Sequence, residues 1–107
     1  MSLHATPDTI LNKVAGSLVA SRVYASAEEA LWEIALSTVR NKASYYQRRI
    51  RRLERKYGAD YDAFTARLKG RASPAEEDDC LDWRSALSML KDWQSAYQEL
   101  LNDRPGR

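Results

Sequence analysis

Regularly spaced apolar residues between positions 32 and 57 constrain the fold of this chain more than any other sequence feature. The apolar positions recur at alternating steps of four and three residues, as in a coiled-coil helix that packs along one narrow face. This pattern predicts one long helix over residues 27–57, about 45 Å in length. The residues of this heptad seam are Trp32, Leu36, Val39, Ala43, Tyr46, Ile50, Leu53 and Tyr57.

Signals for both ends of this helix lie beside the seam. Ser26 followed by Glu29 is a capping box, in which the serine hydroxyl accepts a bond from a free backbone N–H at the start of the helix. Gly58 is placed to end the helix in a left-handed conformation. The helix therefore begins after residue 26 and ends at residue 57.

A second long helix is predicted over residues 74–101. Ser73 and Glu76 form another capping box, and Pro74 occupies the first helical position, where its missing N–H is harmless. A second seam follows at helical spacing: Trp83, Ala86, Leu90, Trp93, Tyr97 and Leu100. Two long seams with a short connection predict an antiparallel helical hairpin.

Two short helices complete the predicted all-α fold. Residues 7–20 repeat apolar positions at helical spacing after Pro7, although an extended segment from residue 18 to 24 remains an alternative. Residues 61–69 follow Asp60, a favourable cap, and precede Gly70. At 107 residues the chain is one domain by length, 1–107, with residues 1–5 and 102–107 expected to be flexible tails.

Charge is segregated along the chain although the net charge is only +2. Eight of the seventeen basic residues lie between Arg40 and Lys56, and five of the fifteen acids lie between Glu76 and Asp82. An antiparallel hairpin brings the two runs face to face, but five acids cannot cover eight bases. Two interpretations stay open: a solvated helix face, or a surface for nucleic-acid phosphates. The candidate residues for the second are Arg48, Arg49, Arg51, Arg52, Arg55 and Lys56.

The two seams also carry more rigid apolar area than two helices can cover. Either helix 7–20 or a second chain covers the rest, and the strict heptad spacing favours a homodimer. Aromatic residues at helical spacing are usually core, but those late in the last helix are candidates for a partner-binding site. These candidates are Trp93, Tyr97 and Leu101.

The sequence offers no catalytic motif that we recognise. Cys80 has no second cysteine and His4 lies in an expected tail, so neither a nucleophile nor a metal site is predicted. The acids at 76–82 lack the alternate spacing of a calcium loop. We expect no enzyme activity and no cofactor. The lone cysteine and the lack of a long apolar run point to a cytoplasmic protein outside the membrane.

Several short motifs follow one another in an order that resembles small antitoxins of prokaryotic toxin–antitoxin pairs. They are Tyr24–Ala30, Ile50–Gly58, Asp62–Phe64 and Asp82–Trp83, within a similarity over roughly residues 22–101. The resemblance implies a cytoplasmic, dimeric, non-enzymatic protein that binds a toxin and can repress its own operon. Such antitoxins often begin with a DNA-binding strand or module, whereas this chain begins with a predicted helix.

Three hypotheses about function follow. The first is an interaction protein that binds and neutralises a protein partner, such as a toxin. The second is a nucleic-acid-binding module that uses the basic part of the long helix, residues 40–56. The third is a self-associating structural protein without a ligand.

Overall fold

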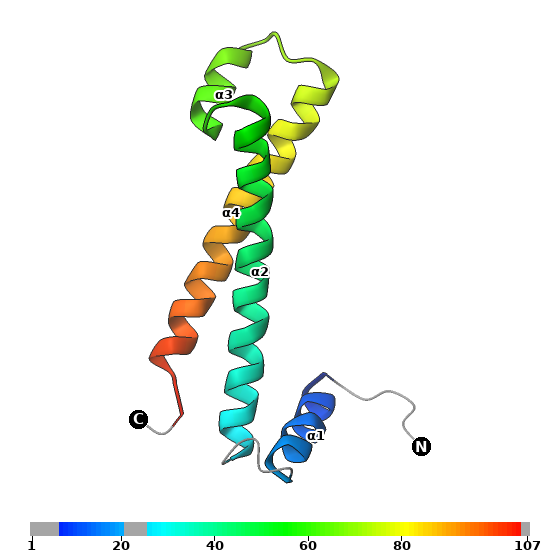
Figure 1. The fold of residues 1–107 in the computed structure, drawn as a ribbon, viewed down its shortest axis with the longest axis vertical. Helices are drawn as coiled ribbons and strands as arrows, with labels where there is room; N and C mark the ends of the chain where they lie inside the picture. Colours follow the sequence, from blue (N-terminus) through cyan, green and yellow to red (C-terminus); the bar gives the residue numbers. More distant parts are fainter. Residues whose placement is uncertain (1–6, 21–25, 106–107) are drawn as a thin grey trace. The chain divides into compact units, whose positions relative to one another are not determined.

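The computed structural model describes residues 7–20 and 26–105, and every regular element in these ranges is an α-helix (Figure 1). The predicted all-α class is confirmed. The third helix ends one residue earlier than expected and the fourth one residue later. Thr6 and the expected tail 1–5 lie outside the described residues. The helices are α1 (Pro7–Ala20), α2 (Ala27–Tyr57), α3 (Tyr61–Leu68) and α4 (Pro74–Asn102).

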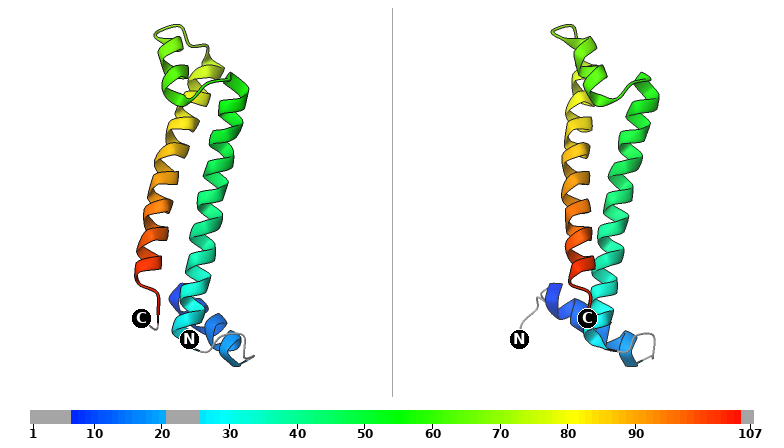
Figure 2. Two further views of the ribbon diagram at one scale, coloured as in Figure 1. Left: turned by 60° about the vertical axis from the view of Figure 1, so that its left-hand side comes forward. Right: turned by 90° about the vertical axis from the view of Figure 1, so that its left-hand side faces the viewer.

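The chain divides into two compact units, which we name the terminal unit and the central unit. The terminal unit consists of Met1–Thr38 and Tyr97–Arg107, and the central unit of Val39–Ala96. The long helices α2 and α4 each contribute to both units. Within the central unit they lie side by side and run in opposite directions, as Figure 2 shows, so the predicted antiparallel hairpin is confirmed.

The core of the central unit is built around Trp83 of α4, which is 0% exposed. The ring of Phe64 lies 5.2 Å from it, and the rings of Tyr57 and Tyr61 lie at 6.2 and 5.7 Å. Four aromatic side chains from α2, α3 and α4 thus meet at one point. Their contact fixes α3 against the end of α2 and the start of α4.

The terminal unit is held partly by Trp32 of α2. Its indole N–H donates a hydrogen bond of 2.6 Å to the carbonyl oxygen of Leu100 in α4. The guanidinium group of Arg104 lies 5.1 Å from the centre of the same ring. Because the indole is buried with its polar atom bonded, Trp32 ties the start of α2 to the end of α4.

Caps or glycine stops lie at five helix ends, and the expected boundary is confirmed at four of them, the end of α3 being the exception. The backbone N–H of Glu29 donates to the hydroxyl of Ser26, and that of Ala63 donates to the carboxylate of Asp60. In the capping box of α4, Glu76 and Ser73 each accept a bond from the backbone N–H of the other. Gly58 and Gly70 adopt positive φ angles of 62° and 74°.

None of the helices in the described ranges has the length and apolar character that a membrane crossing requires.

Candidate interaction surfaces

The heptad seam of α2 is closed within a single chain. Its two half-buried aromatic members, Tyr46 and Tyr57, pack against the core of the central unit. The pattern therefore needs no second chain to bury it, and the homodimer stays a prediction. The buried members of the seam are Trp32, Leu36, Val39, Ile50 and Leu53.

Asp79 of α4 joins two residues at the end of α2. Its carboxylate accepts a bond of 2.6 Å from the ammonium group of Lys56 and a bond from the hydroxyl of Tyr57. These two donors hold the pKa of Asp79 below its ordinary value, Lys56 contributing more than Tyr57. The same carboxylate raises the pKa of Lys56 and, together with burial, that of Tyr57.

A second ion pair lies two turns earlier on α2, between Arg49 and Asp82. The guanidinium group of Arg49 also donates a bond of 2.7 Å to the hydroxyl of Tyr45. The Tyr45 hydroxyl raises the pKa of Arg49, partial burial opposes this, and Asp82 raises the pKa further. The basic run of α2 and the acidic run of α4 were predicted to face each other, and two ion pairs join them: Arg49 with Asp82 and Lys56 with Asp79.

The other four candidate cations of α2 form what we call the arginine stripe. Within the described residues, none of them has an ion pair or a hydrogen bond from its side chain, and each is exposed. Their spacing of three, one and three residues places them on one side of the helix within two turns. The members of the stripe are Arg48, Arg51, Arg52 and Arg55.

One apolar side of α1 is exposed, a feature that the apolar spacing alone does not predict. Ile10, Leu11 and Val14 are 50, 39 and 44% exposed, whereas Ala15 is fully buried. Apolar periodicity showed that these residues share a helix face but not whether anything covers it. We call these three side chains the apolar face of α1.

The three candidate partner-binding residues are all half-buried on α4. Trp93 belongs to the central unit, and Tyr97 and Leu101 belong to the terminal unit. The indole nitrogens of Trp93 and Trp83 are buried without a hydrogen-bond partner among the described residues. Partner binding by these three residues stays a prediction.

A hollow of about 430 Å³ lies between α3 and the first turns of α4. Leu68, Ala72, Cys80 and Leu81 contribute to its apolar lining. The Cys80 thiol lies 3.7 Å from the hydroxyl of Tyr61, and both side chains are partly buried. His4 lies outside the described residues, so no imidazole is placed near this thiol. Residues 7–20 and 26–105 contain no cluster of three side chains that could hold a metal ion.

No known protein family, curated protein or solved structure matches the chain significantly.

Proposed function

We propose that this chain is a non-enzymatic interaction protein that binds a protein partner, in the way that an antitoxin binds its toxin. The observation that carries the proposal is the apolar face of α1. A helix of 14 residues is marginal in water by its own hydrogen bonds, so it depends on burying apolar surface. Here three large aliphatic side chains remain exposed on one such helix.

Burial of this face by a partner is energetically favourable. Covering one large aliphatic side chain contributes about 1.5–3 kcal/mol when it goes from fully exposed to buried, and each of these three is already partly covered. The gain from each is therefore a fraction of that value. Together the three supply the apolar centre of a small interface.

Cytoplasmic location and a homodimer belong to the same proposal. The lone Cys80 is compatible with a reducing compartment, where free thiols persist. The resemblance to antitoxins supports both features. Because the heptad seam of α2 is buried within one chain, a homodimer would use a surface other than this seam and would leave the apolar face of α1 to the protein partner.

The test uses the protein expressed from its own locus together with the neighbouring reading frames. We expect a stoichiometric complex with one protein partner, measured by light scattering after purification. Val14→Lys places a charge in the apolar face and should abolish the complex. Asn12→Lys adds the same charge at another exposed position of α1 and should leave the complex intact.

The two variants separate the outcomes. Equal loss of the complex in both would show that added charge, not the apolar face, prevents binding. A complex that survives Val14→Lys would contradict the proposed surface. Recovery of the chain alone, as an oligomer that Val14→Lys dissociates, would favour the self-associating structural protein over a binder of another protein.

A further inference from the structure

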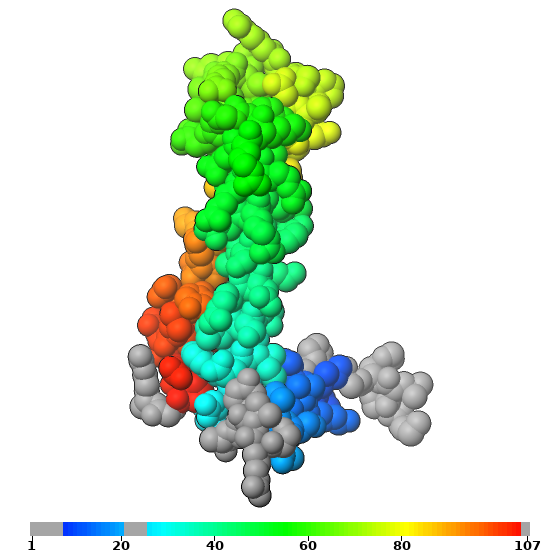
Figure 3. Space-filling model, in the orientation of Figure 1, coloured from blue at the N-terminus to red at the C-terminus, as the bar shows by residue number. Residues whose placement is uncertain are grey.

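The arginine stripe faces away from the core of the central unit. Its members alternate with the seam positions Ile50 and Leu53, which are buried on the opposite side of the same helix turns. Figure 3 shows the segment of α2 that carries the stripe, drawn in green, at the front of the central unit. The stripe is therefore open to a large partner.

The acids of α4 do not neutralise this stripe. Asp79 and Asp82 are bonded to Lys56 and Arg49, on the flank of α2 that faces α4. Glu76 is occupied in the capping box of α4. Arg52 borders a small hollow that Asp79 and Asp82 also line, whereas Arg48, Arg51 and Arg55 do not. Within the described residues, no acid forms an ion pair with any of the four, so the stripe keeps its positive charge for an outside ligand.

The charge density of the stripe indicates what kind of ligand fits. Four guanidinium groups occupy seven residue steps, or about 10 Å of helix axis. Double-stranded DNA carries one negative charge per about 1.7 Å of its axis, so it supplies a matching density of anions. Each planar guanidinium group can bond two phosphate oxygens at once. We propose that the arginine stripe binds the phosphate backbone of double-stranded DNA.

The local geometry favours duplex DNA over other nucleic acids. Single strands are bound through exposed aromatic rings on which bases stack, and Tyr45 is the exposed aromatic residue nearest the stripe. Its ring already lies against the guanidinium group of Arg49, at 5.6 Å, so it is not a free stacking platform. The major groove of DNA is about 12 Å wide and admits a helix, whereas that of duplex RNA is too narrow.

The test measures binding of the full chain to a short duplex of mixed sequence by fluorescence anisotropy at several salt concentrations. Each neutralised phosphate contributes about −0.9 to the slope of log affinity against log salt, so four contacts predict about −3.6. The affinity should then fall roughly 100-fold between 50 and 200 mM salt. Arg51→Gln/Arg55→Gln should weaken binding and reduce the slope to about −1.8.

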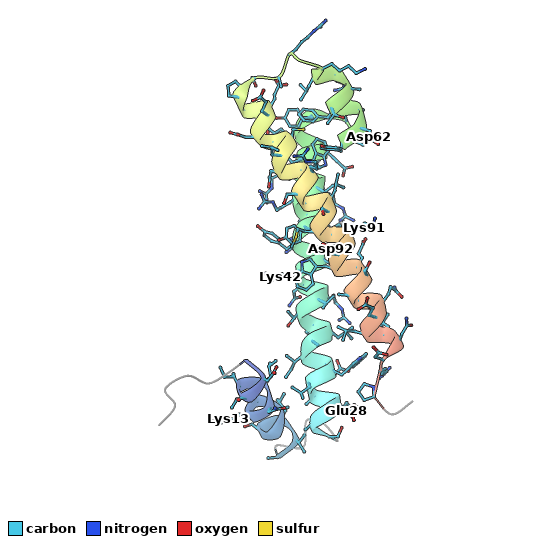
Figure 4. All side chains as sticks on the ribbon, turned by 180° about the vertical axis from the view of Figure 1, so that it is seen from behind. Lys13, Glu28, Lys42, Asp62, Lys91 and Asp92 are labelled. Atoms are coloured by element: carbon cyan, nitrogen blue, oxygen red, sulfur yellow. The ribbon has the colours of Figure 1, made fainter. Side chains whose placement is uncertain are left out.

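A matched control removes two charges elsewhere. Arg84 and Lys91 are exposed cations on α4, and Figure 4 marks Lys91 beside Asp92 on that helix. Arg84→Gln/Lys91→Gln changes the net charge by the same amount and should leave the slope unchanged. Far-UV circular dichroism of both double variants checks that the helices are retained.

Four results would overturn the proposal. The first is no binding to the DNA duplex at about 50 mM salt, where phosphate contacts are strong, and the second is an equal loss of DNA affinity in the two double variants. The third is an affinity for duplex RNA equal to that for duplex DNA. The fourth is an equal affinity for polyglutamate, which would indicate an acidic protein partner. DNA binding by the stripe and protein binding by α1 can be rejected separately. Arg51→Gln/Arg55→Gln leaves the apolar face of α1 unchanged, so the protein complex should survive the loss of DNA binding.

Discussion

At the scale of single residues, Phe64 is a sensitive position because it is 2% exposed and lies between two other aromatic rings. Phe64→Ala removes contacts to Tyr57 and Trp83 and leaves a cavity. We expect a loss of about 3–5 kcal/mol in the free energy of unfolding, measured by urea denaturation. Leu81→Ala is the control, because Leu81 is 55% exposed and its loss should cost about 1 kcal/mol or less. Similar costs for both would mean that Phe64 is not in the core.

The pH dependence of stability rests on Asp79. Because its pKa is lowered in the folded state by Lys56 and then by Tyr57, its contribution is fully present above the ordinary aspartate value of about 4. That contribution is lost as the pH falls through the lower folded value. Asp79→Asn should therefore destabilise the protein at neutral pH and flatten the loss of stability below about pH 4.

Urea denaturation of both proteins at a series of pH values measures this effect. Asp78→Asn is the control, because Asp78 is exposed on the same turn of α4 and forms no ion pair among the described residues. It should retain the acid dependence of the unmodified chain. If Asp79→Asn shows the same acid dependence as the unmodified chain, the bonds from Lys56 and Tyr57 do not operate in solution.

At the scale of elements, the ends of the helices follow from local chemistry. Gly58 ends α2 at a φ of 62°, and an added Cβ would meet no atom within 4 Å. Gly58→Ala should therefore cost about 1–2 kcal/mol through the backbone alone. Gly16 lies inside α1 with similarly open surroundings, so Gly16→Ala should stabilise α1 by about 0.5–1 kcal/mol.

Thermal denaturation followed by far-UV circular dichroism tests the pair. We expect Gly58→Ala to lower the melting temperature and Gly16→Ala to raise it or increase the helical signal. Two changes of the same sign would contradict the difference in backbone conformation between the two glycines.

Element boundaries could be predicted from the sequence because caps and glycine stops act over three or four residues, as at Ser73 and Gly58. The pairing of charges could be predicted only in outline. An antiparallel hairpin brings the runs together, but the axial register of α2 and α4 decides which acids meet Arg49 and Lys56. Among the residues that the structure describes, the arginine stripe forms no ion pair because it lies on the side of α2 opposite the buried seam. The uncovered state of Val14 could not be predicted, since periodicity gives a face without its neighbour.

At the scale of the whole molecule, the burial of the heptad seam within one chain decides which surfaces remain for contact between two chains. Tyr46 is half-buried and packs against the core of the central unit in one chain. Tyr46→Glu should therefore lower the melting temperature, because it places a charge against that core. The mass of the folded protein, measured by light scattering, should not change. A shift from dimer to monomer with the helices retained would show that two chains share the seam.

The central claim is that a protein partner covers the apolar face of α1. Amide hydrogen exchange tests it most directly, on the free chain and on the complex purified from its own locus. We predict that residues 10–18 of α1 exchange at least about tenfold more slowly in the complex, because burial stabilises a marginal helix. The part of α2 that carries the arginine stripe should exchange at the same rate in both. A complex that forms with unchanged exchange in α1 would contradict the claim.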